Sequence, residues 1–233
     1  MAILSAMQSA ALRLVGRKPT TFFGASGTFE AEIADWTNEV AQDIAKYQDW
    51  QALQSVATIT GDGSTEEFDL PADYDRMLVY SDVQDLEAWC WGYRAFDDIN
   101  QFLYHQARGF GPWPGGWIIY GNKLRFSPAP ADGQIATYPY IIKNWAKSSD
   151  STPKAAFDID TDSFVLPERL LTLALVWRWR ENKKLDASGD QEAFIKALDE
   201  YGAKDRGSRP IFKNARRYIA GAYPAWPWAL GGV

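Results

Sequence analysis

The side chains best suited to chemistry are few in this sequence. It contains one histidine, His105, and one cysteine, Cys90. A single residue of each type excludes a site that needs two imidazoles, an internal disulfide framework and a multi-cysteine metal centre. We interpret His105 as a structural histidine, and Cys90, which lies between two tryptophans, as a small packed hydrophobic residue.

Two groups of carboxylates could in principle supply acid–base groups or calcium ligands. Asp97 and Asp98 are adjacent, whereas Asp158, Asp160 and Asp162 alternate. The alternating group lacks the glycine and the terminal glutamate of an EF-hand loop, so we expect a solvated linker there. The sequence also contains no glycine-rich phosphate loop, paired-histidine motif, nucleophile elbow or Cys-x-x-Cys motif. We therefore predict no enzymatic activity, no cofactor and no metal. An enzyme that uses an Asp/Glu pair is an alternative hypothesis.

The C-terminal stretch carries a different kind of signal. Residues 206–217 are basic, and an aromatic, proline-containing tail follows them. Exposed aromatic residues are typical anchors of protein interfaces, and prolines reduce the entropy lost on docking. Three interpretations of this stretch are possible. It could be a solvated tail, a segment that packs back on its own domain, or a docking segment for an acidic protein or nucleic acid. We predict docking to a protein partner through Arg216, Arg217, Tyr218, Tyr223, Trp226 and Trp228.

The charge is unevenly distributed. The net charge is −6, but residues 1–162 carry 12 basic and 22 acidic side chains, whereas residues 163–233 carry 12 basic and 8 acidic ones. An acidic main body argues against general binding of nucleic acid, because phosphates are repelled. We also expect no signal peptide, because residues 1–15 lack a basic n-region and have a helical spacing of apolar residues. We expect no membrane element, because the apolar run at residues 170–176 is far shorter than the roughly 20 residues that span a bilayer.

We predict that the chain is organised around a helix over residues 166–184. Leu170 to Val176 is apolar except for Thr172, so this helix needs neighbours on several sides. Pro167 suits its first turn, and four basic residues collect at its C-terminal end, where cations are favoured. These are Arg178, Arg180, Lys183 and Lys184.

Three more helices are predicted around this one. An amphipathic helix covers residues 3–15, and Thr28 is expected to cap a second helix that runs to about Asp49 or Leu53. A further helix opens at residues 188–190 and ends near Gly207. The buried stripe of the second helix is Phe29, Ile33, Trp36, Val40, Ile44 and Tyr47, and that of the last helix is Phe194, Ile195, Leu198 and Tyr201.

Between the second and central helices the pattern changes to short β-type runs. Strands are predicted over residues 56–60, 67–70, 77–81 and 135–142, and a helix over 94–105 with Phe96, Ile99, Phe102 and Leu103 inward. Gly121-Asn122 separates two further runs, 117–120 and 123–126, which is a strong hairpin signal. Residues 146–163 are rich in Ser, Asp and Lys and indicate a linker.

These elements predict an α+β protein, with an antiparallel helical bundle core, a β-rich insertion and an extended C-terminal tail. The predicted segments are 1–53 and 164–207 for the two halves of the helical core, 54–163 for the insertion with its linker, and 208–233 for the docking tail.

Several stretches, in this order and spacing, resemble the head-to-tail adaptor (connector) proteins of tailed bacteriophages. None of them is a catalytic motif. After the opening helix they are residues 47–53 (YQDWQAL), 61–65 (GDGST), 68–76 (FDLPADYDR), 124–133 (LRFSPAPADG) and 138–141 (YPYI).

The resemblance implies a structural protein at the head–tail interface of the virion, assembled in the host cytoplasm. Such adaptors form a ring, commonly of twelve copies, under the portal protein, and their C-terminal extension reaches the portal. Double-stranded DNA passes through the ring during ejection without specific binding. Tail nozzle or tail tube proteins dock below, and a β-rich insertion like that of short-tailed phages can contact tail fibres. The alternative from the residues alone is a carbohydrate-binding or tail-surface module.

Overall fold

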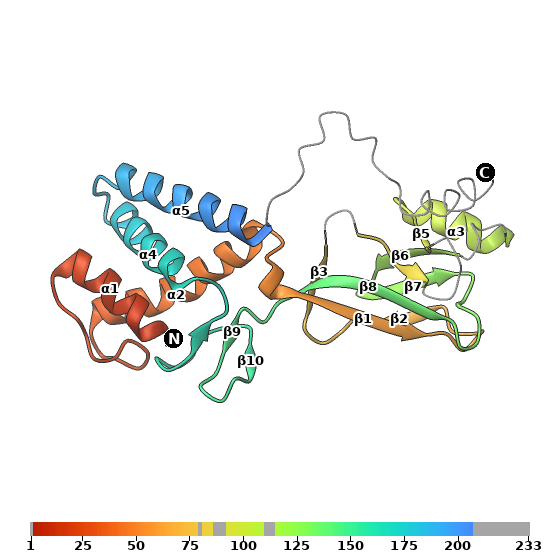
Figure 1. The fold of residues 1–233 in the computed structure, drawn as a ribbon, viewed down its shortest axis with the longest axis horizontal. Helices are drawn as coiled ribbons and strands as arrows, with labels where there is room; N and C mark the ends of the chain where they lie inside the picture. The colour runs from red at the N-terminus through yellow and green to blue at the C-terminus, as the bar shows by residue number, and fades with distance from the viewer. Residues whose placement is uncertain (1, 79–80, 86–91, 110–114, 207–233) are drawn as a thin grey trace, which may run out of the picture. The chain divides into compact units, whose positions relative to one another are not determined.

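The computed structural model describes residues 2–78, 81–85, 92–109 and 115–206. The fold is α+β, as predicted, with five α-helices and three small sheets in these residues (Figure 1). The chain divides into two compact units. The helical unit comprises residues 1–54 and 142–209, and the β-rich unit comprises residues 55–141 together with residues 210–233, which lie outside the described part.

The helical unit is built around α4. Its helices are α1 (Ile3–Val15), α2 (Thr28–Tyr47), α4 (Glu168–Asn182) and α5 (Ser188–Arg206), and a short 3₁₀ turn (Gln51–Leu53) follows α2. Helix α4 contacts each of the other three (Figure 1). Its nearly continuous apolar run explains this position, because Leu170, Leu171, Ala174, Leu175 and Val176 are all buried. The predicted central helix is confirmed.

Helix α1 has the predicted bounds and ends at Gly16, which adopts a left-handed φ of 72°. Helix α2 differs from expectation at both ends. Its N-cap is Gly27, and Thr28 is already helical. The Glu30 carboxylate folds back over Gly27, so a side chain at this position would have to displace it. At the other end Tyr47 is exposed rather than part of the buried stripe.

In α5 the buried face contains Phe194, Ala197 and Leu198, with Tyr201 half-buried. Ile195 is 46% exposed, so its predicted place on this face was wrong. Helix α5 packs mainly against α4, so only a narrow stripe of its surface is buried. Ile195 lies beside that stripe rather than on it.

The stretch expected to be a linker is ordered. Residues 146–163 form part of a three-stranded sheet in the order β10–β9–β11. An aromatic cluster of Trp145, Phe157 and Phe164 packs beside it, with ring centroids 4.8–6.1 Å apart. These residues belong to the helical unit, whereas the sequence had placed them in the insertion. The strands are β9 (Ala146–Lys147), β10 (Pro153–Lys154) and β11 (Ser163–Phe164).

The β-rich unit contains two sheets. The first has the order β1–β8–β3 with β4 also paired to β8, and the second has the order β2–β7–β6–β5. The strands are β1 (Gln54–Thr60), β2 (Glu67–Asp69), β3 (Tyr74–Met77), β4 (Gln84–Asp85), β5 (Arg94–Ala95), β6 (Gly116–Tyr120), β7 (Lys123–Ser127) and β8 (Ile135–Ile142).

The predicted hairpin forms between β6 and β7. Gly121 and Asn122 have φ values of 61° and 60°, which is the backbone that a two-residue turn of type I′ requires. Trp117 faces Phe126 across the pair. Phe126 is fully buried and packs edge-on against Tyr93 at 4.9 Å and Phe68 at 5.7 Å, so this hairpin supplies the core of the second sheet.

Two predicted elements of this unit have different bounds. Strand β3 ends at Met77, and Leu78 and Ser81 of the strand expected over residues 77–81 are not in a strand, while residues 79–80 lie outside the described residues. Helix α3 (Ile99–Arg108) begins after Asp98, because Arg94 and Ala95 pair with β6 as β5. On α3, Phe102 is buried, but Ile99 and Leu103 are exposed. Among the described helices, none is both long and apolar enough to cross a membrane.

Candidate interaction site

The predicted docking segment follows α5 in the chain. Helix α5 ends at Arg206, and residues 207–233 lie outside the described residues. The six predicted docking residues all belong to this segment: Arg216, Arg217, Tyr218, Tyr223, Trp226 and Trp228. The described part of the site is therefore the base from which the segment departs.

That base is held firmly against α4. The rings of Trp177 and Phe194 stack at 5.5 Å with an interplanar angle of 19°. Arg180 of α4 pairs with Asp190 in the first turn of α5. An aromatic stack together with an ion pair fixes the start of α5 in both position and rotation.

The other end of α5 is tied to the segment that follows α2. The Gln51 N–H donates to Asp205 Oδ2 at 2.9 Å, and the Tyr47 hydroxyl donates to Asp199 Oδ1 at 3.0 Å. Gly202 lies so close to Gln48 that a Cβ at this glycine would meet Gln48 Oε1 at 2.7 Å. These contacts hold the C-terminal half of α5 against the end of α2 and the 3₁₀ turn, up to the point where the tail begins.

Two cations at the C-terminal end of α4 form surface ion pairs with acidic residues of the same unit. Arg178 pairs with Asp43 at 2.9 Å, and Lys183 pairs with Glu32 at 2.8 Å. Both acidic partners lie on α2. Arg178 and Lys183 of the predicted basic cluster therefore link the end of α4 to α2, whereas Arg180 pairs with α5.

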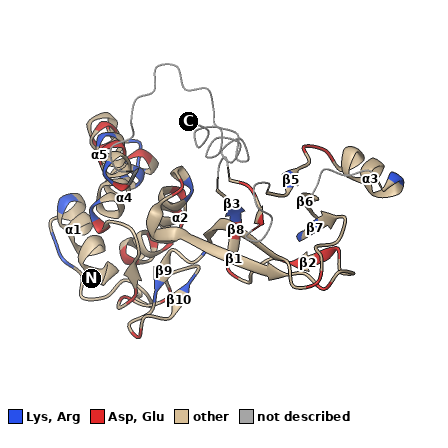
Figure 2. Ribbon diagram, turned by 45° about the vertical axis from the view of Figure 1, so that its right-hand side comes forward, with Lys and Arg blue, Asp and Glu red and all other residues tan. Residues whose placement is uncertain are grey.

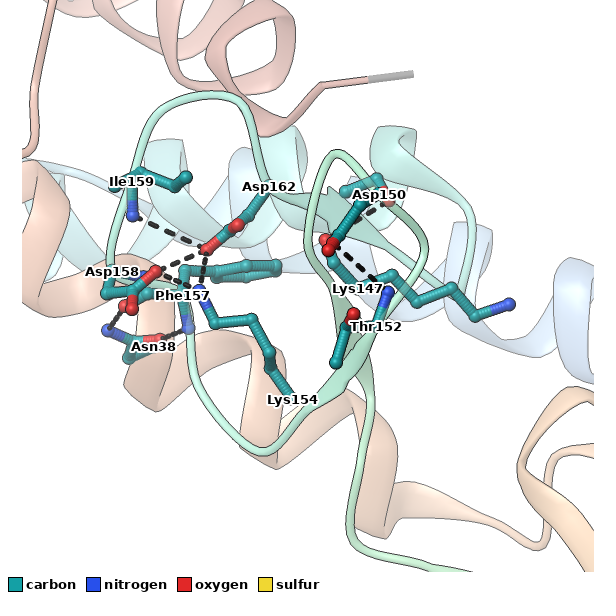
Figure 3. A network of polar contacts seen from close by, with 10 residues as sticks. Asn38, Lys147, Asp150, Thr152, Lys154, Phe157, Asp158, Ile159 and Asp162 are labelled. Carbon is teal, nitrogen blue, oxygen red and sulfur yellow. Dashed lines mark hydrogen bonds and ion pairs between the residues drawn. The ribbon is translucent and has the colours of Figure 1, made fainter.

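A polar network centred on Asp162 stabilises the segment between β9 and α4 (Figure 3). Asp162 is fully buried. Its Oδ2 accepts hydrogen bonds from the Lys154 ammonium at 2.8 Å, the Asp158 N–H at 3.0 Å and the Ile159 N–H at 3.4 Å. Lys154 also pairs with the exposed Asp158.

These bonds explain the electrostatics of the network. Burial alone would raise the pKa of Asp162, but the bonds from Lys154 and from the N–H groups of Asp158 and Ile159 outweigh it and hold that pKa below its usual value. The same two carboxylates, Asp158 and Asp162, raise the pKa of Lys154. The ammonium thus occupies the position between the carboxylates that a bound cation would take.

Neighbouring residues connect this segment to α2 and to the loop before it. Asn38 of α2 both donates to the Phe157 carbonyl and accepts from the Phe157 N–H, at 3.0 and 2.8 Å (Figure 3). Asp160 accepts from the N–H groups of Phe22 and Phe23. Asp158, Asp160 and Asp162 were expected to be solvated, but two of them organise the backbone. The sequence feature that could have indicated this network is Lys154, a cation four residues before Asp158 and eight before Asp162.

A comparison with known protein families identifies the family of this chain. The family model described as SU10 adaptor protein, a phage head–tail adaptor family, matches residues 1–217. This chain belongs to the SU10 adaptor protein family. No curated protein matches it significantly. Membership makes it a structural phage adaptor, or connector, at the head–tail junction, with the portal and the tail as partners, and not an enzyme.

The residues first considered for chemistry have structural positions in this SU10-type adaptor. His105 packs against the Phe96 ring at 5.0 Å on α3. Asp97 and Asp98 are exposed, and Asp98 precedes α3 as its N-cap. Cys90 lies outside the described residues. In the described part of the chain, no group of three or more His, Cys, Asp or Glu side chains could hold a metal ion.

Residues 55–141 of the β-rich unit carry an excess of acidic side chains, seen as red segments in their described part (Figure 2). Residues 55–141 contain twelve Asp or Glu and five Lys or Arg. Along the helices of the helical unit both signs of charge occur. A surface with this excess of carboxylates repels the phosphates of a nucleic acid.

Proposed function

We propose that this adaptor forms a ring, of about twelve copies as the family resemblance implies, between the portal and the tail of the virion. The ring extends the channel for double-stranded DNA and offers a docking surface for the tail. Family membership supports this position. The helical unit supports it physically, because a ring subunit needs a body that keeps its shape under load, and α4 holds three helices together.

The contact with the portal is assigned to the segment containing Arg216, Arg217, Tyr218, Tyr223, Trp226 and Trp228. The observation that carries this assignment is that α5 is fixed along its length and leads directly into this segment. Aromatic anchors would fill apolar pockets of the portal, and the arginines would pair with acidic groups. The aromatics would then dominate the affinity, and the arginines would set the salt dependence and on-rate.

DNA would pass through this ring without specific binding. The acidic excess of residues 55–141 supports this, since a channel wall that attracted phosphates strongly would slow ejection. On the tail side, nozzle or tube proteins would dock, with tail fibres as further partners of the β-rich unit. The exposed apolar residues Ile99 and Leu103 of α3 give that unit a surface suited to a protein contact.

The experiment that tests the portal contact compares two truncations. Deleting residues 222–233 removes Tyr223, Trp226 and Trp228, whereas deleting only 230–233 retains them. We expect the first to abolish loading onto purified portal rings in co-sedimentation, and the second to load normally. Circular dichroism checks that both remain folded. Normal loading of the longer deletion would assign the portal contact to the helical unit instead.

Ring formation is tested separately by native mass spectrometry of the adaptor with and without portal. We expect weak association of the free protein and about twelve copies on the portal. A stable closed ring at low micromolar concentration without portal would contradict the need for a template.

A further inference from the structure

A pocket of about 280 Å³ lies in the helical unit beside the end of α5. It is formed where the 3₁₀ turn, the start of α4 and the last turns of α5 meet. This volume is slightly below the range of about 300–1,000 Å³ of pockets that hold drug-sized ligands, so it suits one aromatic side chain. Its lining is Trp50, Ala52, Val165, Leu166, Pro167, Tyr201, Lys204 and Asp205.

The walls of this pocket are fixed in place. Trp50 is almost fully buried, and its Nε1–H donates to the Ile44 carbonyl at 2.8 Å. Asp205 is held at the rim by the Gln51 N–H. Lys204 lies over the Tyr201 ring at 5.4 Å. The pocket therefore combines a rigid apolar floor with a charged rim.

We propose that in the free protein this pocket binds the aromatic segment 223–228 of the same chain. The position of the pocket supports this occupant, because Lys204 and Asp205 line it and the tail departs one residue later, at Arg206. Twenty residues separate Arg206 from Trp226. A stretch of that length spans up to roughly 66 Å when extended, so the segment can easily return to the pocket.

The chemistry of the segment complements that of the pocket. An indole of Trp226 or Trp228 can pack on the apolar floor and donate its N–H to the Asp205 carboxylate at the rim. Prolines 224 and 227 restrict the backbone conformations open to the segment, which would reduce the entropy lost on docking. Arg216 and Arg217 are attracted by the negative end of the α5 dipole and by Asp199 and Glu200 in its last turns.

Docking within one chain needs little intrinsic affinity. The effective concentration of a segment on a short flexible tether is on the order of millimolar, so a pocket with a millimolar dissociation constant would be about half occupied. Such a weak contact would release its aromatic residues to a tighter site. If the proposed portal function holds, the pocket covers the portal anchors of the adaptor until the portal displaces them, which disfavours premature contacts.

The test traps the docked segment with a disulfide in the full-length chain. In a Cys90→Ser background, Ala52→Cys at the pocket edge is combined with Ala225→Cys beside Trp226. The matched control combines Ala225→Cys with Ala203→Cys. Ala203 is exposed, and the period of 3.6 residues turns it away from the face that Tyr201 and Asp205 share. Oxidised glutathione is added to dilute protein, and non-reducing electrophoresis separates intrachain from interchain products.

We expect the pocket pair to form the intrachain disulfide at least ten times faster than the control pair. Adding Trp226→Ala and Trp228→Ala should lower that rate to the control value. Equal rates for the two pairs would overturn the proposal, and so would products that are mainly interchain, since the occupant would then be the tail of another copy. The assay contains no portal, so its outcome is independent of the truncation experiment that tests the portal function.

Discussion

Replacing Asp162 by Asn should destabilise the helical unit by about 3 kcal/mol. Asparagine keeps the shape of the side chain and an acceptor oxygen for the N–H groups, but it removes the charge. Hydrogen bonds to charged groups contribute about 1 kcal/mol more than neutral ones, and Asp162 accepts two bonds at 3.0 Å or less. The other oxygen, Oδ1, is buried without a hydrogen-bond partner, so an amide group there adds about 1 kcal/mol.

The matched control is Asp158→Asn. Asp158 also pairs with Lys154, but its side chain is 69% exposed, so we expect a loss below about 1 kcal/mol. Urea unfolding followed by far-ultraviolet circular dichroism reports on the helical unit, which holds four of the five described α-helices. A loss for Asp162→Asn that is below 1 kcal/mol, or equal to that of the control, would refute the central role of the buried carboxylate.

The same variant should change the pH dependence of stability. The pKa of Asp162 is depressed in the folded protein, so its contribution is complete above the unfolded value of about 3.9 and disappears as pH falls through the folded pKa. The wild-type protein should therefore lose stability below about pH 4, and Asp162→Asn should lose less over that range. Parallel pH profiles for the two proteins would contradict the assignment.

Three further predictions concern packing, turn and surface charge. Ile33→Ala should lower the free energy of unfolding by about 3 kcal/mol because Ile33 is fully buried. Trp36→Ala should lower it by only about 1–2 kcal/mol because Trp36 is half-buried. The reverse order in urea unfolding would contradict this packing. Gly121→Val should cost about 1–2 kcal/mol at its left-handed φ, with Asn122→Gly nearly neutral; unchanged hydrogen exchange in β6 and β7 would reject this. Arg178→Ala should cost below about 1 kcal/mol and less at high salt; a larger, salt-independent loss would show that more than the surface pair is removed.

Local sequence patterns predicted the elements that depend on local physics. Helix α1 and strand β8 have the expected bounds, and the hairpin turns where Gly121 and Asn122 allow positive φ. The central helix was recognisable because an apolar run of that length can be covered only by several neighbours. In each case the residues that determine the element lie within it or directly beside it.

Contacts between distant residues explain the errors. The stretch 146–163 has the composition of a linker, but Asn38 binds Phe157 across 119 positions and Asp160 binds the Phe22 N–H across 138. No local pattern reveals such pairs. The start of α3 was misplaced for a similar reason, because Arg94 and Ala95 are drawn into a strand by β6, more than twenty residues later.

The ordered stretch between β9 and α4 has a consequence for how the adaptor can vary. The chain leaves the helical unit after residue 54 and returns at residue 142. After the return, hydrogen bonds of Asn38 and Asp160 link residues 157–160 to α2 and to the loop before it. The two halves of the helical unit are thus joined by their own side chains, independently of the β-rich unit. Changes in the β-rich unit, where we propose the tail contacts, should therefore leave α5 in place, together with the base of the segment that we propose binds the portal.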